Sequence, residues 1–302
     1  MAEAQPQLTR DLNELQARDA ERFGGKSASL GELLRAGIPV PPGFAISAEA
    51  GEELTDALRH DIGKRYAGLG DDVAVAVRSS ALGEDSVEAT FAGQQDTYLW
   101  VRGVDAVSTA VQKCWASLYN PEAVAYRERF RIENPAMGVT VQLMVDAAIS
   151  GVMFTCNPVS GDRSMVAVNA SWGLGLAVVG GQVTPDDYVV SKVTGEVVKQ
   201  YISNKHIEYV AGDDGPRLVD VEEPRRTDPC LSADALDSLV AVAKRVESHF
   251  GAPQDIEWAI DQSGELFVLQ SRPVTAVTKK EEQAAAPTSA MSMIFNKFGA
   301  GS

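Results

Sequence analysis

The sequence predicts an α+β protein built from two lobes. Its 302 residues are enough for a sizeable hydrophobic core, in one large domain or in two lobes. Helical and strand-like segments mix along the chain without the strict strand–helix–strand alternation of a doubly wound sheet. No internal repeat is present. These observations favour a two-lobed α+β architecture over a doubly wound fold.

The elements follow from hydrophobic spacing and from turn residues. Helical periodicity predicts helices over residues 27–36, 107–130 and 232–250, with Gly37 closing the first and Ser232 capping the last. Apolar or alternating runs predict the strands at residues 73–78, 97–101, 139–145, 150–155, 165–169, 188–192, 196–202, 255–258 and 266–273.

The chain changes character near its C-terminal end. Residues 278–290 are charged, then alanine-rich, and then rich in Pro, Thr and Ser, which is typical of a linker. The predicted organisation is therefore one domain over residues 7–275, formed by two lobes, followed by a linker and C-terminal tail over residues 276–302. The apolar cluster at residues 291–298 is either an anchor for a partner or a disordered end.

Composition and charge exclude several classes of function. The formal net charge is −15, so the basic footprint of a nucleic-acid-binding protein is missing. The three cysteines are widely spaced, which suits a reducing compartment better than a disulfide framework. No signal peptide is evident at the N-terminus, and no apolar run reaches the length of a membrane span. We expect a soluble, cytoplasmic protein without nucleic-acid or membrane partners.

The most informative segment is a predicted β-hairpin with a turn at residues 261–264. Alternation places Asp255 and Glu257 on one face of the first strand, and Gln270 and Arg272 on one face of the second. Carboxylate and amide oxygens suit Mg²⁺, and an arginine fork suits a terminal phosphate. The hairpin therefore indicates metal-phosphate chemistry, whereas the plain alternative is a solvated face with one surface ion pair.

Two glycine-containing segments are excluded as nucleotide motifs of the usual kinds. Residues 24–27 (Gly-Gly-Lys-Ser) lack the first glycine and the preceding strand of a P-loop. A flexible loop at residues 23–26 would still free Lys26 to reach a phosphate at the start of the next helix. Residues 173–175 (Gly-Leu-Gly) have the wrong spacing for a dinucleotide fingerprint, so we interpret them as a structural loop.

A basic side chain also ends a predicted buried strand. Arg78 follows the apolar residues 73–77, and a desolvated guanidinium needs an anionic partner. That partner is either a nearby acidic residue, Glu84 or Asp85, or a phosphate of a ligand. Downstream, residues 90–95 form a small loop whose backbone N–H groups could hold phosphate oxygens.

In their order along the chain these segments resemble one family. The nucleotide-binding part of phosphoenolpyruvate synthase, pyruvate phosphate dikinase and rifampicin phosphotransferase is similar to this chain from about Leu12 to Thr275. The resemblance implies an ATP-grasp fold that holds ATP between two lobes. It rests on six motifs, at residues 23–33, 38–44, 77–81, 91–94, 150–155, and 255–258 with 270–273.

The resemblance also implies a role for each candidate residue. Lys26 and Arg78 would hold the phosphates of ATP, and residues 142–145 would line the adenine pocket. A loop at residues 90–95 would close over the phosphates. The loop and pocket residues that the resemblance marks for ATP are Thr90, Gly93, Gln94, Gln142 and Met144.

The hairpin supplies the remaining candidates. By the same resemblance, Glu257 and Gln270 would bind Mg²⁺, Asp255 would support them, and Arg272 would grip the terminal phosphates. The catalytic set would then be Lys26, Arg78 and Arg272, acting on ATP with Mg²⁺. Leu176 departs from the family, in which glutamate is common at this position.

The resemblance implies a function that needs a second component. Its members pass a phosphoryl group from ATP to a swinging histidine and release AMP and phosphate. His60, His206 and His249 lack the expected sequence context, so we expect one half of an enzyme, inactive without a histidine-bearing phosphotransfer subunit. The first hypothesis is the ATP-binding subunit of a split dikinase similar to phenylphosphate synthase, which acts on an aromatic alcohol such as phenol.

Two alternatives stay open. The chain could be the ATP-binding domain of a phosphoenolpyruvate synthase or of an antibiotic phosphotransferase. It could also be a non-catalytic module that senses ATP, for which Leu176 is the sequence hint.

Overall fold

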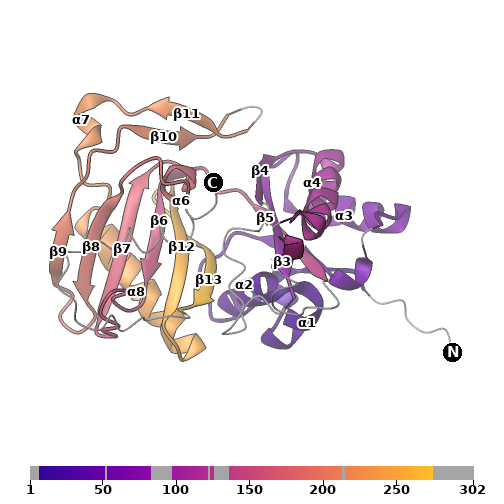
Figure 1. Cartoon of the computed structure of the whole chain (residues 1–302), viewed down its shortest axis with the longest axis horizontal. Helices are drawn as coiled ribbons and strands as arrows, with labels where there is room; N and C mark the ends of the chain where they lie inside the picture. Colours follow the sequence, from indigo (N-terminus) through magenta and orange to yellow (C-terminus); the bar gives the residue numbers. More distant parts are fainter. Residues whose placement is uncertain are drawn as a thin grey trace. The chain divides into compact units, whose positions relative to one another are not determined.

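The computed structural model describes residues 7–51, 53–82, 97–121, 123–125, 136–212 and 215–274. These residues form two compact units. Unit 1 comprises the described parts of Met1–Arg35 and Pro41–Met144, and unit 2 comprises those of Ala36–Val40 and Val145–Ser302. Both units mix helices and sheets (Figure 1), so the expected two-lobed α+β class is confirmed.

Unit 1 is built on a five-stranded antiparallel sheet. Its strands are β1 (Thr9–Asp11), β2 (Gly43–Ile46), β3 (Val75–Ala81), β4 (Thr97–Val101) and β5 (Met137–Leu143). They pair in the order β1-β2-β5-β3-β4. The helices are η1 (Leu12–Glu14), η2 (Ala17–Asp19), α1 (Ala20–Phe23), α2 (Gly25–Arg35), η3 (Ala48–Ala50), α3 (Asp56–Leu69), α4 (Val104–Ala116) and η4 (Ser117–Tyr119).

The two faces of this sheet differ in polarity. Val75 and Val77 of β3 point into a core that α3 and α4 close with buried side chains, among them Ile62 and Trp115. Because side chains alternate along a strand, Arg78 lies on the other face. Thr140 of β5 stands opposite Arg78 in the register, and α2 packs on this polar face.

Unit 2 is built on a six-stranded antiparallel sheet and a separate ribbon. The long strands are β6 (Ala147–Phe154), β7 (Met165–Trp172), β8 (Asp186–Ser191), β9 (Val197–Tyr201), β12 (Gln254–Asp261) and β13 (Leu266–Pro273). Their order is β13-β12-β6-β7-β8-β9. The ribbon pairs β10 (Ile207–Val210) with β11 (Arg217–Asp220), and the helices are α6 (Leu176–Val179), α7 (Glu223–Arg226) and α8 (Ala233–Phe250).

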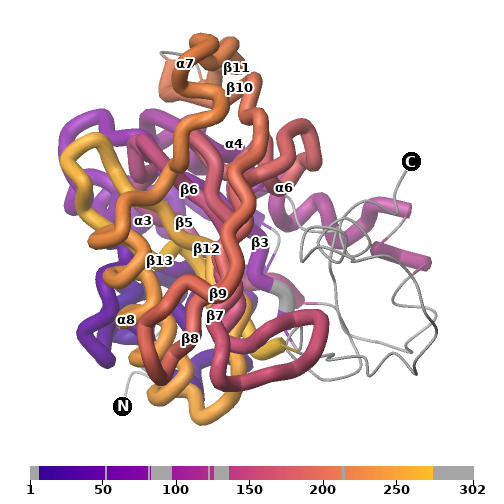
Figure 2. Tube along the Cα trace, turned by 90° about the vertical axis from the view of Figure 1, so that its left-hand side faces the viewer, coloured from indigo at the N-terminus to yellow at the C-terminus, as the bar shows by residue number. Residues whose placement is uncertain are grey.

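Helices cover both faces of the six-stranded sheet. The amphipathic helix α8 runs along one face (Figure 1), and the hydroxyl of Ser232 caps its N-terminus by accepting from the N–H of Ala235. On the other face α6 packs on Val152, Phe154 and Ala167. The β10–β11 ribbon and α7 lie beyond the ends of the long strands in both views (Figures 1 and 2).

Several expected boundaries are wrong. The loop expected at residues 23–26 does not exist as such, because Phe23 ends α1 and α2 begins at Gly25. The helix expected over residues 107–130 starts earlier, at Val104, and the 3₁₀ turn η4 follows Ala116. Helix α3 was not expected, since only Leu58, Ile62 and Tyr66 are buried along its 14 residues. No helix of the described residues is long and apolar enough to cross a membrane.

Candidate functional site

The structure places Lys26 beside the end of β3. Its backbone N–H donates to Ser80 Oγ at 3.2 Å, and its Nζ donates to the carbonyl oxygen of Ser79 at 3.1 Å. Arg78, the residue before Ser79, is only 9% exposed. Both residues thus belong to the part of unit 1 where the start of α2 meets the end of β3. Their role in binding phosphates stays a prediction.

A glycine, rather than a flexible loop, positions Lys26. Gly24 has a φ of +82°, and a Cβ built there would lie 2.1 Å from Ser80 Oγ. Only glycine combines this backbone conformation with so close an approach. In addition, the hydroxyls of Ser27 and Thr140 are 2.6 Å apart, which holds the first turn of α2 against β5. The Gly-Gly-Lys segment is thus packed in place, which corrects the expectation of a free loop.

The residues expected at the adenine pocket lie at the end of β5. Gln142 is buried on the same sheet face as Arg78, opposite Ala76, and its Nε2 lies 3.5 Å from the carbonyl oxygen of Pro41. Met144 is half-buried, and its N–H donates to the carbonyl oxygen of Ala74 at 2.9 Å. Their role in binding a base stays a prediction. Thr90, Gly93 and Gln94 lie outside the described residues.

The two strands of unit 2 that were predicted to form a hairpin pair with each other. Asp255 on β12 stands directly opposite Arg272 on β13, and Glu257 directly opposite Gln270. Arg272 donates from Nε to Asp255 Oδ2 at 2.9 Å, and a second guanidinium nitrogen is also 2.9 Å from that oxygen. The Asp255 side chain is 6% exposed and that of Arg272 is 22% exposed. In this structure the carboxylate therefore orients the guanidinium.

A bulge in the hairpin sets the direction of Gln270. The register shifts between Glu257 and Trp258, so that β13 carries one extra residue, Leu269, between Gln270 and Val268. Such bulges redirect neighbouring side chains and are frequent beside functional sites.

The turn expected at residues 261–264 closes with Asp261 Oδ1, which accepts from the N–H groups of Ser263 and Glu265 at 2.8 Å each.

The donor set at this pair fits magnesium. Directly opposed residues of an antiparallel pair have Cβ atoms about 4.5–5.5 Å apart, so a carboxylate and an amide oxygen can reach one ion. Mg²⁺ takes few protein ligands and completes its octahedron with water and substrate oxygens. Among the described residues there is no cluster of three His, Cys, Asp or Glu side chains able to hold a metal alone. Glu257 and Gln270 would therefore hold Mg²⁺ together with a phosphate-bearing substrate.

The three histidines and Leu176 are the residues on which the choice between catalysis and regulation depended in the sequence. His60, His206 and His249 are all exposed, and His249 contacts the ring of Phe250 edge-on. Leu176 is the half-buried first residue of α6. None of these observations assigns a histidine of this chain to phosphotransfer.

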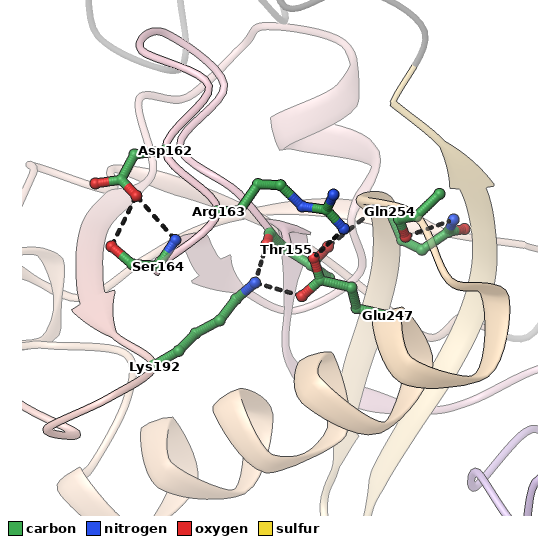
Figure 3. A network of polar contacts seen from close by, with 8 residues as sticks. Thr155, Asp162, Arg163, Ser164, Lys192, Glu247 and Gln254 are labelled. Carbon is green, nitrogen blue, oxygen red and sulfur yellow. Dashed lines mark hydrogen bonds and ion pairs between the residues drawn. The ribbon is translucent and has the colours of Figure 1, made fainter.

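One polar network beside the hairpin had not been predicted. It joins Thr155, after β6, to Lys192, after β8, and to Glu247 of α8, as Figure 3 shows. Arg163 reaches the other oxygen of Glu247 at 3.5 Å. The sequence showed little sign of this network. Apart from Thr155 and Arg163, its members are 29 or more positions apart along the chain.

Comparison with known proteins gives the family. The family model described as "Pyruvate phosphate dikinase, AMP/ATP-binding domain" matches residues 20–69 and 50–293. Phosphoenolpyruvate synthase of Pyrococcus furiosus is 36% identical over 91% of this chain and 44% of its own length. Rifampicin phosphotransferase of a Streptomyces species is 40% identical over 89% of this chain and 36% of its own. The chain thus spans less than half the length of these relatives.

Among solved structures, an acetyl-coenzyme A synthetase of Ca. Korarchaeum cryptofilum covers 85% of this chain and 95% of its own, with 13% identity and a TM-score of 0.43. A likeness this low carries no argument. The family match covers most of the chain, and both sequence relatives agree with it. The chain belongs to the pyruvate phosphate dikinase AMP/ATP-binding domain family.

Proposed function

We propose that the chain is the ATP-binding part of a phosphotransferase of the phosphoenolpyruvate synthase type. It would bind ATP with Mg²⁺ and pass the β-phosphoryl group to a histidine on another domain or subunit, leaving AMP and phosphate. The family, the names of the two relatives and the phosphate-binding chemistry of the candidate residues support this proposal.

The observation that carries the proposal is the register of the β12–β13 hairpin. It places an Arg–Asp pair and a Glu–Gln pair side by side on one sheet face. An arginine held by a carboxylate presents its remaining N–H donors in a fixed direction, which favours bidentate contact with a phosphate. An exposed ion pair alone would not explain the neighbouring Glu257 and Gln270.

In this mechanism the side chains act by charge and position. Lys26 and Arg78 would bind phosphate oxygens, and Arg272 would neutralise charge on the transferring group and align it with the incoming histidine. Magnesium, when bound by Glu257 and Gln270, would supply further charge neutralisation at the phosphates. Because these groups act on the phosphates alone, the acceptor does not enter this step.

The names of the relatives favour the ATP-binding domain of a phosphoenolpyruvate synthase or an antibiotic phosphotransferase over a subunit of a split dikinase that acts on an aromatic alcohol. A phosphoenolpyruvate synthase and an antibiotic phosphotransferase both resemble this chain over about nine tenths of its length. A separate subunit that serves a phenol-phosphorylating enzyme remains a narrower form of the same proposal. An ATP-sensing module without turnover would bind ATP and form no AMP in the presence of any histidine-bearing component.

Titration calorimetry of the chain with ATP in the presence of Mg²⁺ tests the proposal. Arg272→Ala removes a charged donor to the phosphates, a loss of about 1.5–3 kcal/mol or roughly ten- to hundredfold in affinity. Arg217→Ala is the matched control, because it deletes an exposed arginine of the same unit, on strand β11. No binding by the native chain, or equal affinity of both variants, would refute the assignment. With the histidine-bearing component present, Arg272→Ala should also abolish AMP formation.

A further inference from the structure

Thr155 ends the pairing of β6 with β12 in an unusual way. Its N–H donates to the carbonyl oxygen of Gln254 at 2.9 Å. In an ordinary hydrogen-bonded antiparallel pair, the N–H of Gln254 would donate back to the carbonyl oxygen of Thr155. Here it donates to Thr155 Oγ1 instead, at 2.8 Å. The hydroxyl therefore takes the place of the carbonyl, which is left available to another donor.

That donor is a lysine from a distant part of unit 2. Lys192 Nζ donates to the carbonyl oxygen of Thr155 and also forms an ion pair with Glu247 of α8 (Figure 3). Both charged side chains are largely buried. Because the hydroxyl of Thr155 bonds to β12 and its carbonyl oxygen bonds to Lys192, this one residue joins the start of β12 to α8 and to the segment after β8.

We call this set of contacts among Thr155, Lys192, Glu247 and Gln254 the clasp. It lies on the sheet face opposite the candidate site. Gln254, which Thr155 holds, precedes Asp255, and its own side-chain Oε1 accepts from Ser271 Oγ at 2.9 Å. Ser271 stands between Gln270 and Arg272 on β13. One buried glutamine therefore links the Thr155 hydroxyl to both strands of the hairpin, on the face opposite the candidate residues.

We propose that Thr155 is a positioning residue for the metal-phosphate site, and this inference rests on the proposed function. Its hydroxyl fixes the start of β12, and through Gln254 it fixes the register of β13. A slip of one residue would turn Gln270 and Arg272 to the other face of the sheet. Thr155 bonds to Gln254 on the face opposite the candidate residues, so its effect on binding would pass through Asp255 and Arg272.

The experiment compares three single variants by calorimetry with ATP and Mg²⁺, alongside thermal unfolding. Thr155→Val keeps the side-chain shape and removes the hydroxyl, so affinity should fall about tenfold, as when an outer partner of a ligand is lost. Thr155→Ser keeps the hydroxyl and should retain native affinity. Ser150→Ala is the matched control: its buried hydroxyl on the same strand donates to the carbonyl oxygen of Gly173 at 2.6 Å, away from Asp255.

Two results would overturn the inference. One is an equal loss of affinity in Thr155→Val and Ser150→Ala at equal loss of thermal stability. The other is a Thr155→Ser variant as weak as Thr155→Val. Failure of the native chain to bind ATP with Mg²⁺ would instead refute the proposed function, so the two failures are distinguishable.

Lys192→Met provides an independent check if Thr155→Val does not fold. It removes the ammonium group from the Thr155 carbonyl and should itself lower affinity for ATP with Mg²⁺. Where both variants fold, the double variant should lose less affinity than the product of the two single losses, since both break one clasp. Unchanged affinity in Lys192→Met, or independent effects in the double variant, would contradict the clasp.

Discussion

Two consecutive aspartates of β8 form lysine pairs that differ greatly in burial. Asp186 Oδ1 is 2.6 Å from Lys205 Nζ, and both side chains are 0% exposed. Asp187 Oδ2 is 2.8 Å from Lys199 Nζ, where the lysine side chain is 55% exposed. Replacing each lysine by methionine removes one ammonium group and keeps most of the side-chain volume, so the two variants isolate the effect of burial.

The expected costs follow from what each aspartate keeps. In Lys205→Met, the donors that the described part of the chain leaves to Asp186 are neutral, among them the N–H groups of Ser203 at 3.0 Å and Cys230 at 2.8 Å. Breaking a buried pair in this way destabilises by about 3–5 kcal/mol. An exposed pair contributes about 0–1 kcal/mol, so Lys199→Met should be nearly neutral.

Urea unfolding followed by circular dichroism measures the difference. We expect Lys205→Met to be less stable than Lys199→Met by about 3 kcal/mol at unchanged denaturant slope. A gap below about 1 kcal/mol would refute the reasoning, because it would mean that water reaches Asp186 in the folded protein.

Three further predictions concern backbone strain, pH and thiol reactivity. Gly24→Ala should destabilise the protein more than Gly51→Ala. Both glycines have a positive φ, which costs an alanine about 1–2 kcal/mol, but of the two only Gly24 would also bring its Cβ against a close neighbour, Ser80. Equal unfolding midpoints of the two variants would contradict this. Hydrogen bonds from Arg22 hold the pKa of Glu49 below its usual range, so this pair stabilises above the ordinary carboxyl pKa and is lost as pH falls through the lowered value. Glu49→Gln should therefore flatten the acid limb of a stability–pH curve slightly, and an unchanged limb would rule out the linkage. Burial raises the pKa of Cys156, so its thiol should react with a disulfide reagent only after unfolding, and rapid labelling of the native chain would contradict this.

The sequence was most informative where structure is local. Alternation and turn chemistry were enough to predict the hairpin. Its register was not predictable, because counting back from the turn would set Asp255 opposite Ser271, and the extra residue Leu269 brings Arg272 there instead. Lys26 and Arg78 were each recognised from short motifs. Alternation along β3 places Arg78 on the polar face of the unit 1 sheet, whereas the position of Lys26 depends on its contacts with Ser79 and Ser80, 53 and 54 positions later.

The sequence was least informative where contacts join distant segments. The role of Gly24 depends on Ser80, 56 positions later, so its spacing suggested a loop. The Thr155 clasp depends on Lys192 and Glu247, and no local pattern marks a hydroxyl that replaces a carbonyl. Such contacts depend on how whole helices and strands pack against one another, and a single sequence does not show which residues of distant elements will meet.

The most direct test of the proposed function follows the β-phosphate of ATP. The tagged chain, isolated from its host with its natural components, is incubated with Mg²⁺ and ATP labelled at that phosphate. We predict acid-labile label on a histidine outside residues 1–302 together with release of AMP, and neither with Arg272→Ala. ATP binding without AMP or labelled protein, or label on a histidine of this chain, would contradict the proposal.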